Sequence, residues 1–202
     1  MSAGGSLITL EGVDGAGKST HMQFIADQIG ARGQRVVVTR EPGGTELAER
    51  LRKLILEEPM APLAETLLLF AARADHVARV IRPALESGQW VVCDRFTDAT
   101  FAYQGAGKGV AAELIERLSS AVHPGLRPHR TLVFDCSYEV AAKRLAATGR
   151  PLDRFEREAR DFYERVRKAY LDIARKEPER VRVIDASADV ATVRKAIAAG
   201  LA

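Results

Sequence analysis

Long apolar runs are missing from this sequence of 202 residues, which also contains no asparagine and only two cysteines. No apolar stretch reaches the roughly 18 residues that a membrane-spanning helix needs, so we expect no contact with a membrane. The net charge of +3 is too small to indicate a nucleic-acid partner. The composition, with 47% hydrophobic and 28% charged residues, excludes collagen-like, low-complexity and disordered proteins.

The two cysteines, Cys93 and Cys136, each lie near the end of an apolar run and have no metal-ligating neighbour in the sequence. Buried, reduced thiols of a cytoplasmic protein are the simpler interpretation, and a redox pair is the alternative. The first residues, MSAGGS, contain neither the basic nor the apolar segment of a secretory signal. We therefore expect a cytoplasmic protein.

Short apolar runs alternate with segments that have helical periodicity. The predicted strands are residues 7–10, 35–39, 90–93, 131–134 and 181–184. The predicted helices are residues 18–31, 46–58, 62–88, 97–104, 111–121 and 137–147, a helix that ends near 176, and a last helix that closes the chain. Strands that are apolar throughout and separated by helices predict a parallel sheet covered on both faces, a three-layer α/β fold with ligands at the carboxyl ends of the strands. The length fits one domain, residues 1–202, in which the polar, arginine-rich segment 148–158 is a loop.

A glycine-rich sequence follows the first predicted strand and opens the first helix. Residues 12–19, GVDGAGKS, match the P-loop pattern G-x-x-x-x-G-K-[ST]. Glycines let the backbone N–H groups turn toward phosphate oxygens, and the helix N-terminus faces the same anion. The residues predicted to bind ATP are Gly12, Val13, Asp14, Gly15, Ala16, Gly17, Lys18, Ser19 and Thr20. Without asparagine the chain lacks the Asn-Lys-x-Asp motif of GTPases, and it also lacks the Ser-Gly-Gly-Gln signature of ABC ATPases, which leaves a small kinase or an unclassified ATPase.

Four further segments carry groups that can bind a second substrate. Residues 40–44, REPGG, follow the second predicted strand, and residues 94–96, DRF, follow the third. Phe70 and Arg73 are three residues apart and share a face of the long helix, where a ring and a guanidinium can bind a base. Residues 100–105, TFAYQG, offer hydroxyl, phenol and amide groups. Taken alone, residues 40–44 fit an ordinary connection between a strand and a helix, and residues 94–96 fit a surface ion pair. For Phe70 and Arg73 alone, a core ring and a solvent-exposed arginine are the favoured alternatives.

Together, these segments resemble the thymidylate kinase family. The resemblance rests on LEGVDGAGKST, TREPGGT, LLLFAAR, DRFTDATFAYQG and LDRFE, in this order along nearly the whole chain. It implies a P-loop fold with a five-stranded parallel sheet, a short lid over residues 148–158, and a homodimer. It also implies phosphorylation of dTMP to dTDP in dTTP biosynthesis, with ATP as co-substrate and Mg²⁺ as cofactor.

The resemblance also assigns roles to single residues of the substrate site. The residues that it implies for dTMP binding are Asp14, Arg40, Glu41, Arg52, Phe70, Arg73, Arg95, Thr100, Tyr103 and Gln104. Asp14 would accept a hydrogen bond from the 3′-hydroxyl, Arg40, Arg52 and Arg95 would hold the phosphate, and Glu41 would lie near the sugar and Mg²⁺. Phe70 would stack on thymine, Arg73 would donate to O4, Thr100 and Gln104 would read the N3 edge, and Tyr103 would disfavour ribose. Many members space the stacking ring and the arginine by four residues, which in this sequence would put Leu69 at the position of the ring.

The catalytic residues that the resemblance implies are Lys18, Arg95, Arg154 and Arg150. Lys18 would bind the β- and γ-phosphates, and Ser19 and Asp94 would hold Mg²⁺. Residues 13–16 contain no basic side chain, whereas the lid contains Arg150 and Arg154. The resemblance therefore implies the bacterial subtype with a catalytic lid arginine, Arg154 as first candidate and Arg150 as second.

Two other classes of function stay open at this stage. One is a P-loop kinase with a different acceptor, such as a nucleoside or another monophosphate. The other is a P-loop protein that binds nucleotide without transferring phosphate. Adenine contacts are not evident from the residues, although residues 185–187 after the last strand are a plausible location.

Overall fold

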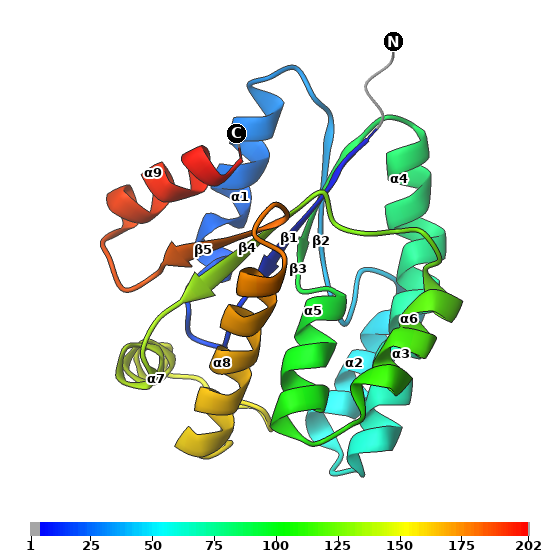
Figure 1. Cartoon of the computed structure of the whole chain (residues 1–202), viewed down its shortest axis with the longest axis vertical. Helices are drawn as coiled ribbons and strands as arrows, with labels where there is room; N and C mark the ends of the chain where they lie inside the picture. The colour runs from blue at the N-terminus through cyan, green and yellow to red at the C-terminus, as the bar shows by residue number, and fades with distance from the viewer. Residues whose placement is uncertain (1–4, 202) are drawn as a thin grey trace.

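A five-stranded parallel sheet forms the centre of the computed structural model, which describes residues 5–201 (Figure 1). The strands are β1 (Leu7–Glu11), β2 (Val36–Arg40), β3 (Trp90–Asp94), β4 (Arg130–Asp135) and β5 (Val181–Asp185). Their order is β2-β3-β1-β4-β5, and every adjacent pair is parallel. All residues of the central strand β1 are buried, as a strand covered on both faces requires. The predicted α/β class and the five strands are confirmed.

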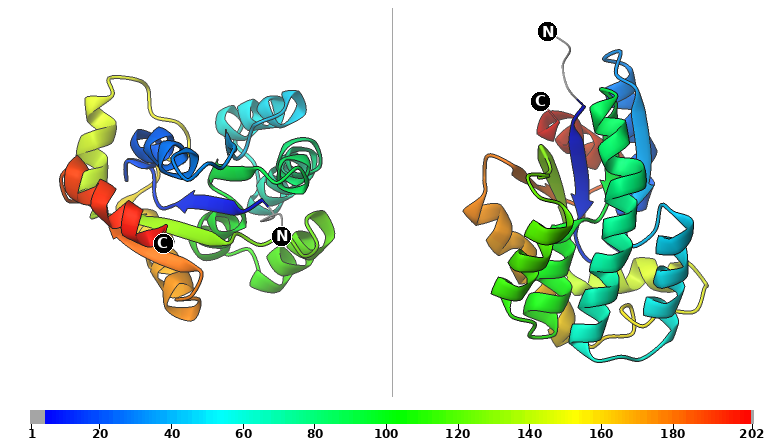
Figure 2. Two further views of the ribbon diagram at one scale, coloured as in Figure 1. Left: turned by 90° about the horizontal axis from the view of Figure 1, so that it is seen from above. Right: turned by 90° about the vertical axis from the view of Figure 1, so that its right-hand side faces the viewer.

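Helices cover both faces of this sheet (Figure 2). They are α1 (Lys18–Gly30), α2 (Glu46–Glu57), α3 (Pro62–His76), α4 (Arg82–Glu86), α5 (Thr97–Thr100), α6 (Ala112–Val122), α7 (Tyr138–Ala147), α8 (Arg160–Lys176) and α9 (Val190–Gly200). Helix α1 packs against β2 and β3, and α8 packs against β4 and β5 on the opposite side. The connections at the carboxyl ends of the strands therefore meet at one edge of the sheet, where the motifs lie.

Two wide helical turns interrupt the helices that line this edge. The predicted helix 62–88 is α3 and α4 joined by the π-helical turn η1 (Val77–Ile81). A second π-helical turn, η2 (Phe101–Gly107), follows α5 and carries Tyr103 and Gln104. Such turns are frequent at functional sites because they change which side chains face a neighbour.

Local sequence signals explain where several helices begin. Pro62 occupies the first turn of α3, where its missing N–H is not needed. Thr45 and Ser137 each accept a backbone N–H at the start of α2 and α7. Residues 148–159 form turns without helix or strand, as expected of a loop.

Both cysteines are free and buried, which agrees with the interpretation as reduced thiols. Within residues 5–201, no helix is both long enough and apolar enough to cross a membrane. The prediction that no secretory signal begins the chain concerns residues that lie mostly outside the described range.

Candidate active site

The P-loop curls around the N-terminus of α1, as the motif predicts. Gly12 and Gly15 have φ angles of 128° and 80°. A side chain at Gly15 would also lie 2.5 Å from the carbonyl oxygen of Ala141, so only glycine fits. The Lys18 Nζ donates to the carbonyl oxygens of Gly12 and Val13, at 3.0 Å each. Burial and the nearby Arg95 lower the pKa of Lys18. An anion in the loop would therefore find this ammonium already oriented.

A large cavity of about 700 Å³ opens beside the P-loop. Its lining includes residues 14–20 of the loop together with Arg40, Glu41, Arg52, Asp94, Arg95, Arg144 and Arg150. The turn after β5 contributes Ala186 and Ala188 to the same wall, close to the predicted adenine location. This volume is in the usual range of nucleotide-sized pockets.

Asp94, at the end of β3, fits the role of a magnesium ligand. Its Oδ1 is buried and has no hydrogen-bond partner among the described residues. A buried carboxylate oxygen without a donor is costly, and a cation relieves that cost. Ser19 lines the same cavity. Residues 5–201 contain no cluster of three or more His, Cys, Asp and Glu arranged for a metal, but Mg²⁺ typically takes one or two protein oxygens and completes its shell with phosphates and water.

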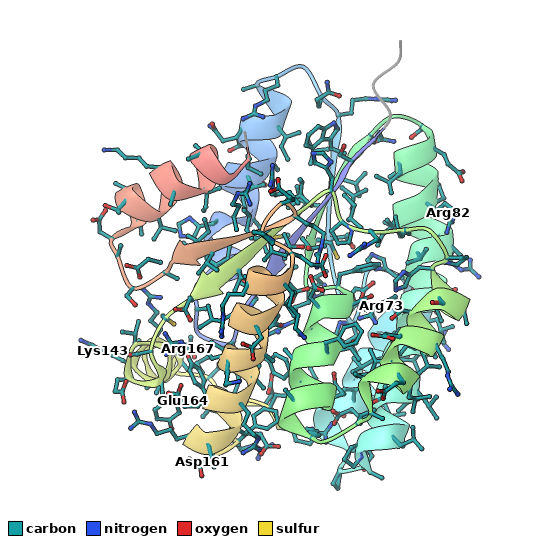
Figure 3. The ribbon with its side chains drawn as sticks, in the orientation of Figure 1. Arg73, Arg82, Lys143, Asp161, Glu164 and Arg167 are labelled. Carbon is teal, nitrogen blue, oxygen red and sulfur yellow. The ribbon has the colours of Figure 1, made fainter. Side chains whose placement is uncertain are left out.

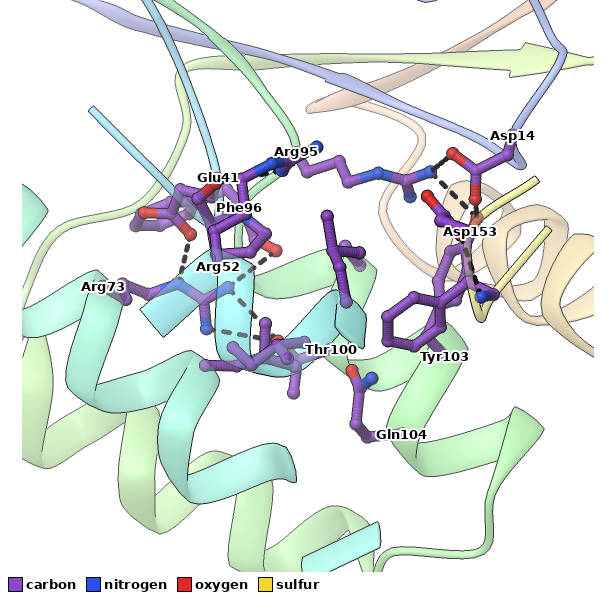
Figure 4. Close-up of a pocket in the computed structure, with 16 residues that line it drawn as sticks. Asp14, Glu41, Arg52, Arg73, Arg95, Phe96, Thr100, Tyr103, Gln104 and Asp153 are labelled. Carbon is purple, nitrogen blue, oxygen red and sulfur yellow. Dashed lines mark hydrogen bonds and ion pairs between the residues drawn. The ribbon is translucent and has the colours of Figure 1, made fainter. Parts of the chain in front are cut away.

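A second cavity lies next to the first, beside the residues that follow β2 and β3 (Figure 4). It is lined by Asp14, Glu41, Pro42, Arg52, Ile55, Leu56, Leu69, Arg73, Arg95, Phe96, Ala99, Thr100, Tyr103, Gln104, Asp153 and Phe155. We call it the acceptor cavity. Asp14, Glu41, Arg52, Arg95 and Asp153 line both cavities, so these residues form the boundary between them.

Arg95 and Asp14 are paired at this boundary. The Arg95 Nη2 lies 2.6 Å from Asp14 Oδ1 and 2.9 Å from the hydroxyl of Tyr103, which itself donates to Asp14 Oδ2. Burial opposes the charge of Asp14, but Arg95 and Lys18 outweigh it and lower the pKa of Asp14 to about 2. Asp14 is therefore an anion at neutral pH that can accept a hydrogen bond from a sugar hydroxyl.

Arg73 projects from α3 into the interior (Figure 3), where it is only 3% exposed. Its Nε donates to Glu41 Oε2 at 2.6 Å. Its terminal nitrogens donate to Thr100 Oγ1 and to the carbonyl oxygen of Phe96, which leaves one N–H of Nη1 without a partner among the described residues. Burial would raise the pKa of Glu41, but Arg73 and His76 lower it. The predicted groups Glu41, Arg73 and Thr100 thus form one fixed network.

Phe70 is not in the place that the stacking role requires. Its side chain is buried at 2% exposure, and its ring centre lies 4.8 Å from the Arg73 guanidinium carbon. Leu69, rather than Phe70, is among the residues that line the acceptor cavity. Phe70 therefore packs against the Arg73 guanidinium outside the cavity, because Leu69 occupies the helix position that faces the cavity.

The three predicted phosphate-binding arginines are not equivalent. Arg95 is deeply placed between the cavities, and the φ angle of 71° at this residue turns its side chain toward Asp14. Arg52 donates to the carbonyl oxygen of Pro42 at 3.0 Å and lines both cavities. Arg40 is half-exposed, forms an ion pair with Glu49, and lines only the P-loop cavity of the two.

The two lid arginines point to different places. Arg150 lines the P-loop cavity and is half-exposed, with an ion pair to Glu156 at 2.5 Å. Arg154 lines neither the P-loop cavity nor the acceptor cavity. Its guanidinium binds the carbonyl oxygen of Ile55 and the buried carboxylate of Glu65. Of the two candidates, the structure thus places Arg150 at the P-loop cavity and anchors Arg154, the first candidate, away from the phosphate loop.

Sequence reasoning missed several residues of this site. Asp153 and Phe155 of the lid form part of the acceptor cavity. Arg144 donates to the carbonyl oxygens of Ala16 and Ala186, so it joins the P-loop to the turn after β5. The motif LDRFE contained the first two, but only the fold reveals the position of Arg144.

Comparison with known proteins agrees with this geometry. The family model described as "Thymidylate kinase" matches residues 10–197. The thymidylate kinase of Methylobacillus flagellatus is 53% identical over 193 residues, which are 96% of this chain and 95% of the relative. That of Ralstonia nicotianae is 55% identical over 195 residues, 95% of each chain. The crystal structure of thymidylate kinase from Ehrlichia chaffeensis has a TM-score of 0.75 at 34% identity and covers 96% of this chain and 97% of its own. This chain belongs to the thymidylate kinase family, an ATP-dependent kinase family that phosphorylates dTMP to dTDP.

Proposed function

We propose that this chain transfers the γ-phosphoryl group of ATP directly to dTMP, with Mg²⁺, in the synthesis of dTTP. The observation that carries the proposal is the shared boundary of the two cavities, formed around Asp14 and Arg95. Donor and acceptor phosphates that enter from opposite sides would meet there in line. Positioning of this kind supplies much of the rate of phosphoryl transfer.

On the acceptor side, Arg95 and Arg52 at the boundary hold the dTMP phosphate, and Arg40 approaches it from the P-loop cavity. Asp14 accepts a hydrogen bond from the 3′-hydroxyl, and the ring of Tyr103 lies beside C2′. The base packs against Leu69, and its polar edge meets Arg73, Thr100 and Gln104. A phosphate with a second pKa of about 6 is already a nucleophile near neutral pH, so no strong general base is needed.

On the donor side, Lys18 and the backbone N–H groups of residues 12–20 bind the ATP phosphates. Ser19 and Asp94 would hold Mg²⁺, which when bound neutralises charge on the phosphates. Arg150 is the lid arginine that reaches the transferring group, as in the bacterial subtype. Its half-exposed guanidinium forms two hydrogen bonds with the carboxylate of Glu156, and it would exchange this pair for the phosphate when ATP binds.

The lid, residues 148–158, belongs to the single domain of residues 1–202 and carries both arginines. We also propose a homodimer in the cytoplasm. Helices α2 and α3 expose Leu47, Leu54, Leu63 and Leu67, each between 42% and 50%. Neighbouring exposed leucines on packed helices are typical of a protein interface. Sedimentation of the wild type and of Leu63→Glu with Leu67→Glu tests the dimer, and two monomeric profiles would refute it.

A substrate panel tests the acceptor. ADP release is measured with ATP and Mg²⁺ against dTMP, dUMP, UMP, dCMP, AMP and GMP. We expect a strong preference for dTMP. Preference for another monophosphate would refute the roles of Arg73, Thr100 and Gln104, and ATP binding without turnover of any acceptor would refute the transferase.

A further inference from the structure

Glu65 is a buried carboxylate that no motif of the chain includes. It lies on α3 with 0% exposure and accepts hydrogen bonds from three side chains of other segments. Gln104 Nε2 is 2.8 Å from Oε1, Lys108 Nζ is 2.8 Å from Oε2, and the Arg154 guanidinium from the lid contacts Oε2. Glu65 is not among the described residues that line the acceptor cavity, so it can affect the cavity only through a side chain that does line it, such as Gln104.

This contact fixes the orientation of the Gln104 amide. Both oxygens of Glu65 accept hydrogen bonds from the neighbouring donors, so the NH₂ group of Gln104 must face Glu65. The amide oxygen then points the other way. Gln104 lines the acceptor cavity (Figure 4), and within residues 5–201 no donor is bonded to its Oε1. The cavity therefore contains a hydrogen-bond acceptor at Gln104 and a donor at Arg73.

A donor and an acceptor on the wall of one cavity match one kind of pyrimidine edge. Thymine and uracil present an acceptor at O4 beside a donor at N3–H, whereas cytosine presents the reverse, an N4 donor beside the N3 acceptor. We propose that Glu65 is a specificity-determining positioning residue, which holds the Gln104 amide so that the site accepts bases with an N3–H and rejects cytosine. The inference rests on the proposed reading of the base by Gln104.

The substitution Glu65→Gln tests this role. A glutamine at position 65 can donate to the Gln104 oxygen, so the Gln104 amide can turn and present its NH₂ group to the cavity. We expect the ratio of kcat/KM for dTMP over dCMP to fall about tenfold or more, because the binding site then tolerates the N3 acceptor of cytosine. The ratio for dTMP over dUMP should stay unchanged, since both bases carry N3–H. A merely structural loss would lower kcat/KM for all three substrates alike and would overturn the inference.

Two further variants separate this inference from the proposed function. Lys108→Met removes a cation from the same carboxylate but leaves Gln104 bonded to it, so the dTMP to dCMP ratio should stay as in the wild type. Gln104→Leu should lower the ratio, and adding Glu65→Gln to it should lower the ratio no further. If Gln104→Leu leaves the ratio unchanged, Gln104 does not read the base and the proposed role fails. If it lowers the ratio and Glu65→Gln does not, only the role of Glu65 is overturned.

A measurement on the wild type keeps the inference testable if the Glu65 variant does not fold. The side-chain amide protons of Gln104 are assigned in a ¹⁵N spectrum by their loss in Gln104→Leu. We expect one of them to be protected from solvent exchange without ligand and to remain so with dTMP bound. Rapid exchange without ligand, or a protected proton that changes partner with dTMP, would overturn the inference.

Discussion

The lid arginines offer the sharpest test, because their sequence context and their position in space favour different residues. Arg150 lines the P-loop cavity, so Arg150→Ala should remove a cation that stabilises charge in the transition state. Loss of one such group lowers kcat by roughly 100- to 1,000-fold, equivalent to about 3–4 kcal/mol. The KM for dTMP should change little, because Arg150 does not line the acceptor cavity.

Arg154→Ala is the matched substitution in the same loop, and its effect should be different in kind. Arg154 anchors the lid to Ile55 and Glu65, next to Asp153 and Phe155. Its removal leaves Lys108 on the Glu65 carboxylate, so the loss of stability should be about 1–3 kcal/mol. Phe155, which lines the acceptor cavity, is then held less firmly, so the KM for dTMP should rise up to about tenfold. The decrease in kcat should be smaller than this factor.

Steady-state ADP release at saturating ATP and varied dTMP separates the two effects, and thermal unfolding of each variant measures stability. A single-turnover experiment shows whether the chemical step is the one that slows. The reasoning is refuted if Arg154→Ala loses 100-fold or more in kcat at unchanged KM while Arg150→Ala turns over normally. In that case the lid must rearrange, releasing Arg154 from Glu65 before transfer.

Three other predictions concern the boundary and the core. Asp94→Asn should lower kcat at least tenfold and raise the Mg²⁺ concentration needed for half-maximal rate, because the buried oxygen loses its charge; an unchanged Mg²⁺ titration would contradict the assignment. Tyr103→Ala should lower the ratio of kcat/KM for dUMP over that for UMP, because the ring lines the acceptor cavity and its hydroxyl donates to Asp14. An unchanged ratio would show that Tyr103 does not disfavour ribose. Burial and the neighbouring Asp98 raise the pKa of Glu11 from 4.5 to about 8, so the folded protein binds this proton more tightly than the unfolded chain. The free energy of unfolding should therefore fall by up to about 1.4 kcal/mol per pH unit between those two values. Glu11→Gln should remove this slope in urea titrations, and equal slopes in both proteins would show that Glu11 does not titrate there.

Much of the fold could be predicted because its signals are local. A strand buried on both faces is mostly apolar, as residues 7–10 of β1 and 90–93 of β3 are, and helices between such strands imply parallel pairing. The π-helical turns could not be predicted, since the predicted helices 62–88 and 97–104 run into residues 77–81 and 101–107 without a local signal, and only packing decides the wider turn. The strand order likewise depends on contacts far apart in the sequence.

Some residues of the candidate site could likewise be predicted from local sequence, whereas others depend on contacts that only the fold creates. The P-loop is contiguous, so its residues could be identified directly, as could Arg95 and Asp94 at the end of an apolar strand. Arg73, taken alone, resembles a solvent-exposed arginine, because its partners Glu41 and Thr100 lie 32 and 27 residues away. Phe70 and Leu69 differ by one helix position, and only the burial pattern shows which one faces the cavity.

The unusual backbone conformation of Arg95 determines where its side chain lies. A non-glycine residue with a φ of 71° costs of order 1–3 kcal/mol, and such a conformation persists only where the surroundings enforce it. Here the backbone N–H of Arg95 bonds to Leu10 on the neighbouring strand, and its guanidinium bonds Asp14 and Tyr103. The strained residue thus joins the end of β3 to the P-loop, and it places one cation between the cavities where two phosphates would meet. A glycine would adopt this φ without strain but would lack the cation, which is why an arginine at this position is better explained by phosphate binding than by folding.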